Sequence, residues 1–133
     1  MSEFDWIAWL KHQAQSRIPA RSDVIRGIGD DAAVCTVPDG MQLVISTDIL
    51  VSGVHFPEDT APIDIGYKAL AVNLSDIAAM GAQPCWLSLA ISMPEMNWDW
   101  LTQFSEGLIE LAAEHGVQII GGDTTRGPLS ITI

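Results

Sequence analysis

The stretch 64–93, DIGYKALAVNLSDIAAMGAQPCWLSLAISM, decides the class of fold. Its first part carries apolar residues at helical spacing, which predicts a helix over about 64–80, and Gly81 is a suitable C-terminal stop. In its second part, 86–93, leucine and isoleucine alternate with serine and alanine, which predicts a strand with one buried face. A long helix that leads directly into a strand indicates an α/β or α+β domain.

The segments after this stretch repeat the same order of elements. Asn97 can cap a second long helix, whose apolar residues follow a 3.6-residue period until Gly116. We expect strands at 117–120 and 129–133, separated by a glycine-rich loop at 121–127. Together these segments predict a mixed β-sheet covered by helices.

The segments before this stretch predict a short helix and a hairpin. The helix spans about 2–15 and begins with a near match to a capping box. The hairpin consists of strands at 32–37 and 42–47 around the turn Pro38-Asp39-Gly40. No internal repeat or low-complexity linker divides the chain, so we expect a single domain over residues 1–133.

Composition restricts the partners and the location of the protein. With 17 acidic against 6 basic residues and a formal net charge of -11, direct binding of nucleic acid is not expected. No long uninterrupted apolar stretch and no basic leader occur, so we expect a cytoplasmic protein that binds no membrane. Cys35 and Cys85 lack metal-ligand spacing and are expected to be buried free thiols. The apolar strand pattern runs to Ile133, so we expect a further domain to follow it.

Five aspartates lie in segments that otherwise read as apolar strands, a helix or glycine turns. They are Asp30, Asp31, Asp48, Asp76 and Asp123. Carboxylates are seldom buried unless they are paired or coordinate an ion, because an isolated buried charge is too costly. Oxygen ligands of this kind suit magnesium, calcium or manganese. The pattern therefore indicates a metal site.

The segment 27–32, Gly-Ile-Gly-Asp-Asp-Ala, matches a loose dinucleotide-binding fingerprint. That fingerprint requires a following helix, whereas a β-rich segment follows here, so we reject it. A solvated tight turn and a metal loop both remain open for Asp30 and Asp31.

Ser46, Thr47 and Asp48 follow a short apolar run that reads as a buried strand. Magnesium is commonly bound by a hydroxyl and an aspartate at such a strand end, while nucleotide phosphates fill further positions. A helix cap or turn would use the same residue types. His55, between two apolar residues, could bind a substrate or pack against the core, and packing is the commoner role for such a residue.

Asp76 lies within an apolar stripe of the helix predicted over 64–80. Asn73, one turn earlier, could donate a hydrogen bond to it, and Lys68 lies two turns away. A structural network is therefore one alternative, and a bound cation is the interpretation that we favour.

The expected loop 121–127, Gly-Gly-Asp-Thr-Thr-Arg-Gly, combines glycines, two hydroxyls, a carboxylate and a guanidinium. Glycine amides can surround a phosphate, and arginine can donate two hydrogen bonds to it. A P-loop signature and the protein-kinase signatures are absent, so any nucleotide chemistry belongs to another class.

These residues carry a resemblance to a known family. The motifs are Gly27-Ile-Gly-Asp-Asp31, Ser46-Thr-Asp-Ile-Leu-Val51, Gly53-Val-His-Phe56, Lys68-Ala-Leu-Ala-Val-Asn-Leu-Ser-Asp-Ile-Ala-Ala-Met-Gly-Ala82 and Gly121-Gly-Asp-Thr-Thr-Arg126. In this order and spacing they resemble the N-terminal domain of the bacterial thiamine-monophosphate kinases. The wider superfamily includes aminoimidazole ribonucleotide synthetase, selenophosphate synthetase and a hydrogenase maturation factor.

The resemblance implies phosphorylation of thiamine monophosphate to thiamine diphosphate, with ATP as co-substrate and Mg²⁺ as cofactor. Carried over by position, the implied metal ligands are Asp30, Ser46, Thr47, Asp48, Asp76 and Asp123. His55 would contact the thiamine substrate, and Gly122 with Asp123 would contact ATP. The resemblance also implies a homodimer formed through the sheets, and a C-terminal domain without which this chain would be inactive.

Two other functions remain possible from the sequence. The same domain could belong to a sister ATP-using synthetase, or it could be a non-catalytic dimerisation and metal-binding module.

Overall fold

The computed structural model describes residues 2–133 and contains three long helices and two small sheets. In chain order, the elements are α1 (Glu3–Arg17), β1 (Val24–Arg26), β2 (Val34–Cys35), β3 (Ile49–Val51), α2 (Pro62–Ala79), β4 (Trp86–Met93), α3 (Trp98–His115), β5 (Gln118–Arg126) and β6 (Ser130–Thr132). The predicted α/β class is therefore confirmed.

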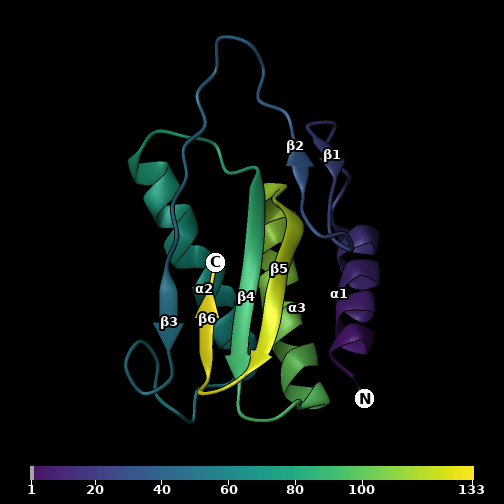
Figure 1. Cartoon of the computed structure of the whole chain (residues 1–133). Coiled ribbons are helices and arrows are strands. Elements are labelled where there is room, and N and C mark those ends of the chain that lie inside the picture. Colours follow the sequence, from purple (N-terminus) through teal and green to yellow (C-terminus); the bar gives the residue numbers. More distant parts are fainter. Residues whose placement is uncertain (1) are drawn as a thin grey trace.

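The larger sheet is mixed, as predicted. Its strand order is β3-β6-β4-β5, with β4 and β5 parallel and the other neighbours antiparallel. Helices α2 and α3 lie on one side of this sheet, and α1 lies beyond β5 against α3 (Figure 1). The other face of the sheet has no helix over it within the described residues (Figure 1). Among residues 2–133, no helix has the length and apolar character needed to cross a membrane.

The predicted capping residues are confirmed. Ser2 and Asp5 form a complete capping box, in which the Ser2 amide donates to the Asp5 carboxylate at 2.8 Å. Asn97 caps α3 by accepting from the Trp100 amide at 3.0 Å. Gly116 ends the same helix with φ of 64°, a conformation that favours glycine.

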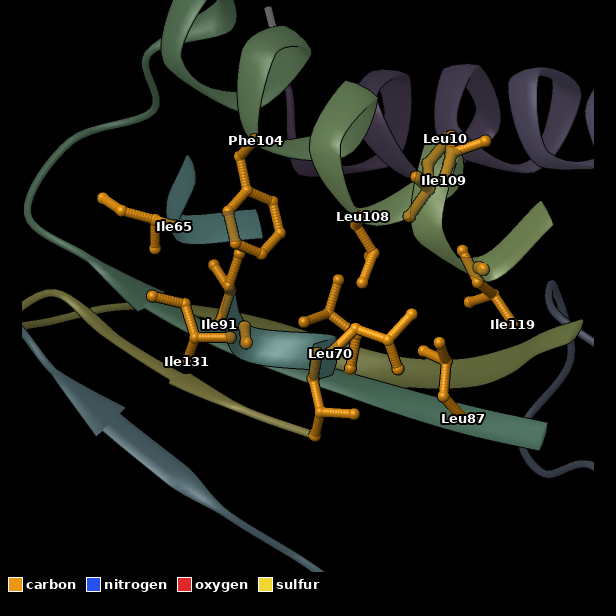
Figure 2. Close-up of a cluster of buried hydrophobic side chains, with 14 of the residues drawn as sticks. Leu10, Ile65, Leu70, Leu87, Ile91, Phe104, Leu108, Ile109, Ile119 and Ile131 are labelled. Atoms are coloured by element: carbon orange, nitrogen blue, oxygen red, sulfur yellow. The ribbon is translucent and has the colours of Figure 1, made fainter. Parts of the chain in front are cut away.

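The core lies between β4 and helices α2 and α3. Along β4 the buried residues alternate with Ser88 and Ala90, which are exposed on the open face of the sheet. Figure 2 shows side chains from the sheet and from both helices meeting in one cluster. The labelled members are Leu10, Ile65, Leu70, Leu87, Ile91, Phe104, Leu108, Ile109, Ile119 and Ile131.

Helices α2 and α3 approach each other closely at two glycines. A β-carbon on Gly66 would lie 2.0 Å from the carbonyl oxygen of Phe104, and one on Gly107 would lie 2.0 Å from that of Ile63. Both contacts are with helix backbone, which cannot turn aside as a flexible side chain could. The glycines therefore permit the packing that holds α2 against the rest of the domain.

The predicted hairpin at 32–47 is wrong. Only Val34–Cys35 forms a strand, and it pairs with Val24–Arg26 instead of with 42–47. The segment 42–47 belongs to no strand, and two of its three apolar side chains are exposed, Leu43 at 53% and Ile45 at 78%. It extends as a long connection between β2 and β3 (Figure 1). No strand of the described residues pairs with this segment.

The predicted loop at 121–127 is also wrong, because β5 continues through it to Arg126. Residues Gly121–Arg126 pair with Ser88–Met93 of β4, after an irregularity in register at Leu87 and Ser88. A β-carbon on Gly122 would lie 1.7 Å from the carbonyl oxygen of Leu89. Glycine at this position serves the close approach of two strands.

Candidate functional site

Ser46, Asp48 and Asp76 form the cluster of oxygen ligands that the fold brings together. The Ser46 hydroxyl lies 3.5 Å from Oδ2 of Asp76 and donates to it. Asp48 is held at the start of β3, where its amide donates to the Ile133 carbonyl at 3.0 Å and its carbonyl accepts from the Ile133 amide at 3.1 Å. Asp76 projects from the last turn of α2, which extends toward the segment leading into β3 (Figure 1).

The two carboxylates of this cluster influence each other. Partial burial raises the pKa of the Asp48 carboxyl above its usual range, and a hydrogen bond with Asp76 and the negative charge of Asp76 raise it further. A positive charge on His55, when its ring is protonated, would act in the opposite direction and lower the pKa of Asp48. The pair therefore resists full ionisation unless a positive charge accompanies it.

No basic side chain of residues 2–133 forms an ion pair with Asp48 or Asp76. The three ion pairs in this part of the chain are Arg17–Glu106, Arg21–Asp23 and Arg26–Asp30. Two carboxylates and a hydroxyl form an oxygen ligand set of the kind that Mg²⁺ prefers. Thr47 lies between Ser46 and Asp48 in the sequence and is exposed. The donor chemistry of this cluster therefore fits a divalent cation.

The other two predicted aspartate ligands are not brought to this cluster. Across residues 2–133, no group of three or more histidine, cysteine or acidic side chains is placed to hold one metal ion. Asp30 instead accepts a hydrogen bond from Arg26, which with the Asp31 amide lowers the pKa of the Asp30 carboxyl. Asp123 lies on β5 opposite Ala90 of β4 and is exposed.

The expectation that the five aspartates are buried is wrong for this chain. Asp48 is half-buried and the other four are exposed. For Asp76 the reason is that the end of α2 lies outside the core, although the helical stripe itself was assigned correctly. Carboxylates at the surface of the domain can be reached by a ligand or by another domain.

The structural network considered for Asp76 is not formed. The side-chain amide of Asn73 donates to the Ala69 carbonyl at 2.9 Å, and Lys68 donates to the His55 carbonyl. Neither of the two residues considered as a structural partner of Asp76 binds it, so the interpretation of Asp76 as a ligand for a cation stands.

His55 lies on a tight turn between β3 and α2. Its ring is exposed, and its neighbour Phe56 is the residue that packs into the core. Nδ1 of His55 accepts a hydrogen bond from the Val51 amide at 2.8 Å. The alternative in which His55 packs against the core is therefore wrong.

The last part of β5 carries Gly122, Asp123 and Arg126. The Arg126 Nε donates to the Pro94 carbonyl at 3.3 Å, and Thr124 is buried on the helix side of the sheet. A cavity of about 360 Å³ borders this end of the strand and is lined by Met93, Glu95, Thr124, Thr125 and Arg126 among others.

The glycine turn at 27–30 borders a larger cavity of about 580 Å³ between α1 and the end of β1. Its lining includes Lys11, Gln15, Arg26, Gly29, Asp30 and Gln118. Cys35 and Cys85 lie elsewhere as half-buried free thiols, which confirms that they are free and corrects the expected full burial.

Two contacts were missed from the sequence. The Arg26–Asp30 pair has opposite charges four residues apart, a spacing that could have indicated it. The contact between Lys68 and the His55 carbonyl joins residues 13 positions apart through a backbone atom, and no local pattern signals it.

Comparison with known proteins gives one consistent result. The model of the family described as AIR synthase related protein, N-terminal domain, matches residues 29–133. The chain is 53% identical to a thiamine-monophosphate kinase of Salmonella typhimurium, over 98% of this chain and 39% of that protein. It is 49% identical to the crystal structure of a thiamine-monophosphate kinase from Stenotrophomonas maltophilia K279a, with a TM-score of 0.85 over 99% of this chain and 40% of that one.

A third comparison concerns a structure with bound ligands. AaThiL complexed with AMPPCP and TMP shares the fold, with a TM-score of 0.62 and 24% identity over 98% of this chain and 40% of that one. In each of these comparisons the chain spans about two fifths of the length of its relative.

Proposed function

The chain belongs to the AIR synthase related protein family through the N-terminal domain of that family, and from this membership we propose that it is the N-terminal domain of a thiamine-monophosphate kinase. The activity would be the transfer of the γ-phosphoryl group of ATP to thiamine monophosphate, which yields thiamine diphosphate. One observation carries the proposal. A carboxylate pair, Asp48 and Asp76, lacks a basic partner in a chain that is 53% identical to such a kinase.

The residues that would hold Mg²⁺ are Ser46, Thr47, Asp48 and Asp76. When bound, the ion would offset the negative charge of the phosphates and of the two carboxylates. We also propose Asp30 and Asp123 as ligands of further ions, since they do not form one group with the pair in this chain.

The remaining residues would bind and orient the two substrates. His55 would contact the thiamine substrate, while the amide of Gly122 and the carboxylate of Asp123 would contact ATP. The negative charges of the two phosphate groups oppose their approach. The site would therefore offset these charges and hold the attacking and transferred phosphates in line. The transfer is direct, with no covalent intermediate on the protein.

We further propose a homodimer that forms through the sheets. The apolar residues Met41, Leu43 and Ile45 are exposed on an extended segment that no strand of the described chain covers. The open face of the larger sheet, which carries Ser88 and Ala90, lies on the same chain without a covering helix (Figure 1). An extended segment with unpaired backbone groups and exposed apolar side chains favours pairing with a second copy.

We propose a cytoplasmic location because the reaction requires ATP, which bacteria make in that compartment. We also propose that the 133-residue chain is inactive by itself, because it spans 39% of the kinase from Salmonella typhimurium.

The experiment that tests the function is the formation of thiamine diphosphate from thiamine monophosphate, ATP and Mg²⁺. The natural full-length protein and the 133-residue chain are assayed side by side. We expect product from the full-length protein alone. If the full-length protein makes none, with Mg²⁺ and ATP both supplied, the kinase assignment is wrong and a sister synthetase should be assayed next.

A further inference from the structure

We propose that His55 binds the thiamine substrate as a neutral imidazole that donates a hydrogen bond from Nε2, and that Lys68 is the residue that positions it. This inference rests on the proposed function. It specifies the chemical form in which His55 acts and adds a residue to the site.

The first step concerns the tautomer of the His55 ring. Its Nδ1 accepts the Val51 amide hydrogen at 2.8 Å, so Nδ1 carries no proton. A neutral imidazole with an accepting Nδ1 has its hydrogen on Nε2, and a protonated ring could not accept this bond. The exposed ring therefore presents a donor to whatever contacts it.

The second step concerns the turn that carries His55. The His55 amide donates to the Val51 carbonyl at 2.9 Å, and the Gly53 amide donates to the Phe56 carbonyl at 2.8 Å. Gly53 has φ of 80°, which favours glycine, and Phe56 is 4% exposed in the core. The backbone of this turn is therefore anchored before and after His55.

The third step concerns Lys68 of α2. Its ammonium donates to the His55 carbonyl, so it connects the turn to the middle of that helix. Asp76 lies on the same helix eight residues later, about 12 Å along the helix axis. One rigid element thus bears both the carboxylate that would bind the cation and the contact that places His55.

The fourth step concerns the substrate. Thiamine monophosphate contains a cationic thiazolium ring and a neutral aminopyrimidine ring whose nitrogens accept hydrogen bonds. A neutral donor can approach such a molecule without the repulsion that an imidazolium would meet at the thiazolium. We therefore assign the Nε2 hydrogen to an uncharged acceptor atom of the thiamine moiety.

The test of Lys68 uses steady-state kinetics of the full-length enzyme. Lys68→Met removes the donor, Lys68→Arg keeps one, and Arg17→Met removes a cation of α1 that pairs with Glu106 and lies in no proposed site. We expect Lys68→Met to raise the KM for thiamine monophosphate about tenfold, the effect of losing one hydrogen bond that orders a binding residue, with kcat within about threefold and the KM for ATP unchanged. Lys68→Arg should recover most of the loss, and Arg17→Met should behave as the wild type.

The test of the donor uses two substitutions of His55. Glutamine can place an amide nitrogen near the position of Nε2, whereas asparagine reaches only the position of Nδ1. We expect His55→Gln to keep a lower KM for thiamine monophosphate than His55→Asn. The opposite order, or a Lys68→Met enzyme with wild-type KM, would overturn the inference while leaving the kinase assignment intact.

A spectroscopic measurement separates the two proposals. Long-range ¹H–¹⁵N spectra of the full-length protein labelled at histidine report which ring nitrogen carries the proton, and His55→Asn identifies the signal. A neutral ring protonated on Nε2 supports the inference. A neutral ring protonated on Nδ1 refutes it, whether or not the enzyme turns over thiamine monophosphate.

Discussion

Replacing Gly107 with alanine should destabilise the domain through the crossing of α2 and α3. The added β-carbon would lie 2.0 Å from the Ile63 carbonyl oxygen, whereas ordinary contacts begin at 3.4 Å. The two helices must therefore move apart by roughly 1 Å or more at their closest point, and core residues beside them must follow. Alanine is favoured over glycine inside a helix by about 1 kcal/mol, which offsets part of the cost.

The net change in the free energy of unfolding follows from the cost of the clash and the gain in helix propensity. Overpacking typically costs about 1–3 kcal/mol, and contact between two backbones belongs at or above the upper end of that range. After the gain in helix propensity, we expect a loss of about 2 kcal/mol in the free energy of unfolding, or a decrease in Tm of roughly 5–10 °C.

The assay is urea unfolding followed by tryptophan fluorescence, with thermal unfolding as a second measurement. Gly27→Ala is the matched control, because its β-carbon would meet ordinary contacts of 3.4 and 3.6 Å. The pair Gly66→Ala and Gly107→Ala should cost less together than the sum of the two, since one displacement of the helices relieves both clashes. A Gly107→Ala variant as stable as the wild type would show that the helices do not cross at this distance.

Three further predictions concern the site and the proposed dimer. Asp48→Asn and Asp76→Asn should each lower kcat of the full-length enzyme by at least about 100-fold, because each removes a ligand of the cation that would accompany the phosphates. Asp31→Asn should lower kcat much less. Equal, small effects of all three substitutions in a turnover assay would contradict the site. Since the pKa of Asp48 is raised in the folded state, the stability that it contributes is present at acidic pH and is lost as pH rises through that folded-state pKa. Without metal, Asp48→Asn should therefore have a higher Tm than the wild type at pH 7. Mg²⁺ should raise the Tm of the wild type more than that of the variant. A lower Tm for the metal-free variant would contradict repulsion between the two carboxylates. Leu43→Ser with Ile45→Ser should shift the protein toward monomer in light-scattering measurements without lowering the stability of each subunit, because both side chains are exposed in the single chain; an unchanged dimer would place the interface elsewhere.

The helices and β4 were predictable because their signals are local. The capping box at Ser2 and the glycine stop at Gly116 act within a few residues of the element that they end. The alternation along β4 reflects one buried face, and the structure confirms it from Trp86 to Met93. Such patterns need no knowledge of which element lies opposite.

The two errors in the fold arise from contacts between distant segments. The apolar run at 43–45 is typical of a strand, but no strand of the described residues pairs with it. The glycines at 121–122 are typical of a loop, yet Gly122 is required by the Leu89 carbonyl oxygen of the neighbouring strand. In both cases the local pattern was read correctly and the partner decided the outcome.

The candidate site divides in the same way. Its ligand chemistry follows from the sequence alone, because Ser46, Asp48 and Asp76 are oxygen donors in motifs that resemble those of a known family. Their proximity does not follow from the sequence, since the two aspartates are 28 positions apart and α2 must be packed before they meet. The exposure of Asp76 and the bond from Lys68 to the His55 carbonyl likewise depend on where folded elements end. The sequence by itself determined the helices, the strand at Trp86–Met93 and the chemistry of the site, because these depend on neighbouring residues. Tertiary packing decided which other segments become paired strands and which side chains meet, because distances between remote segments exist only in the folded chain.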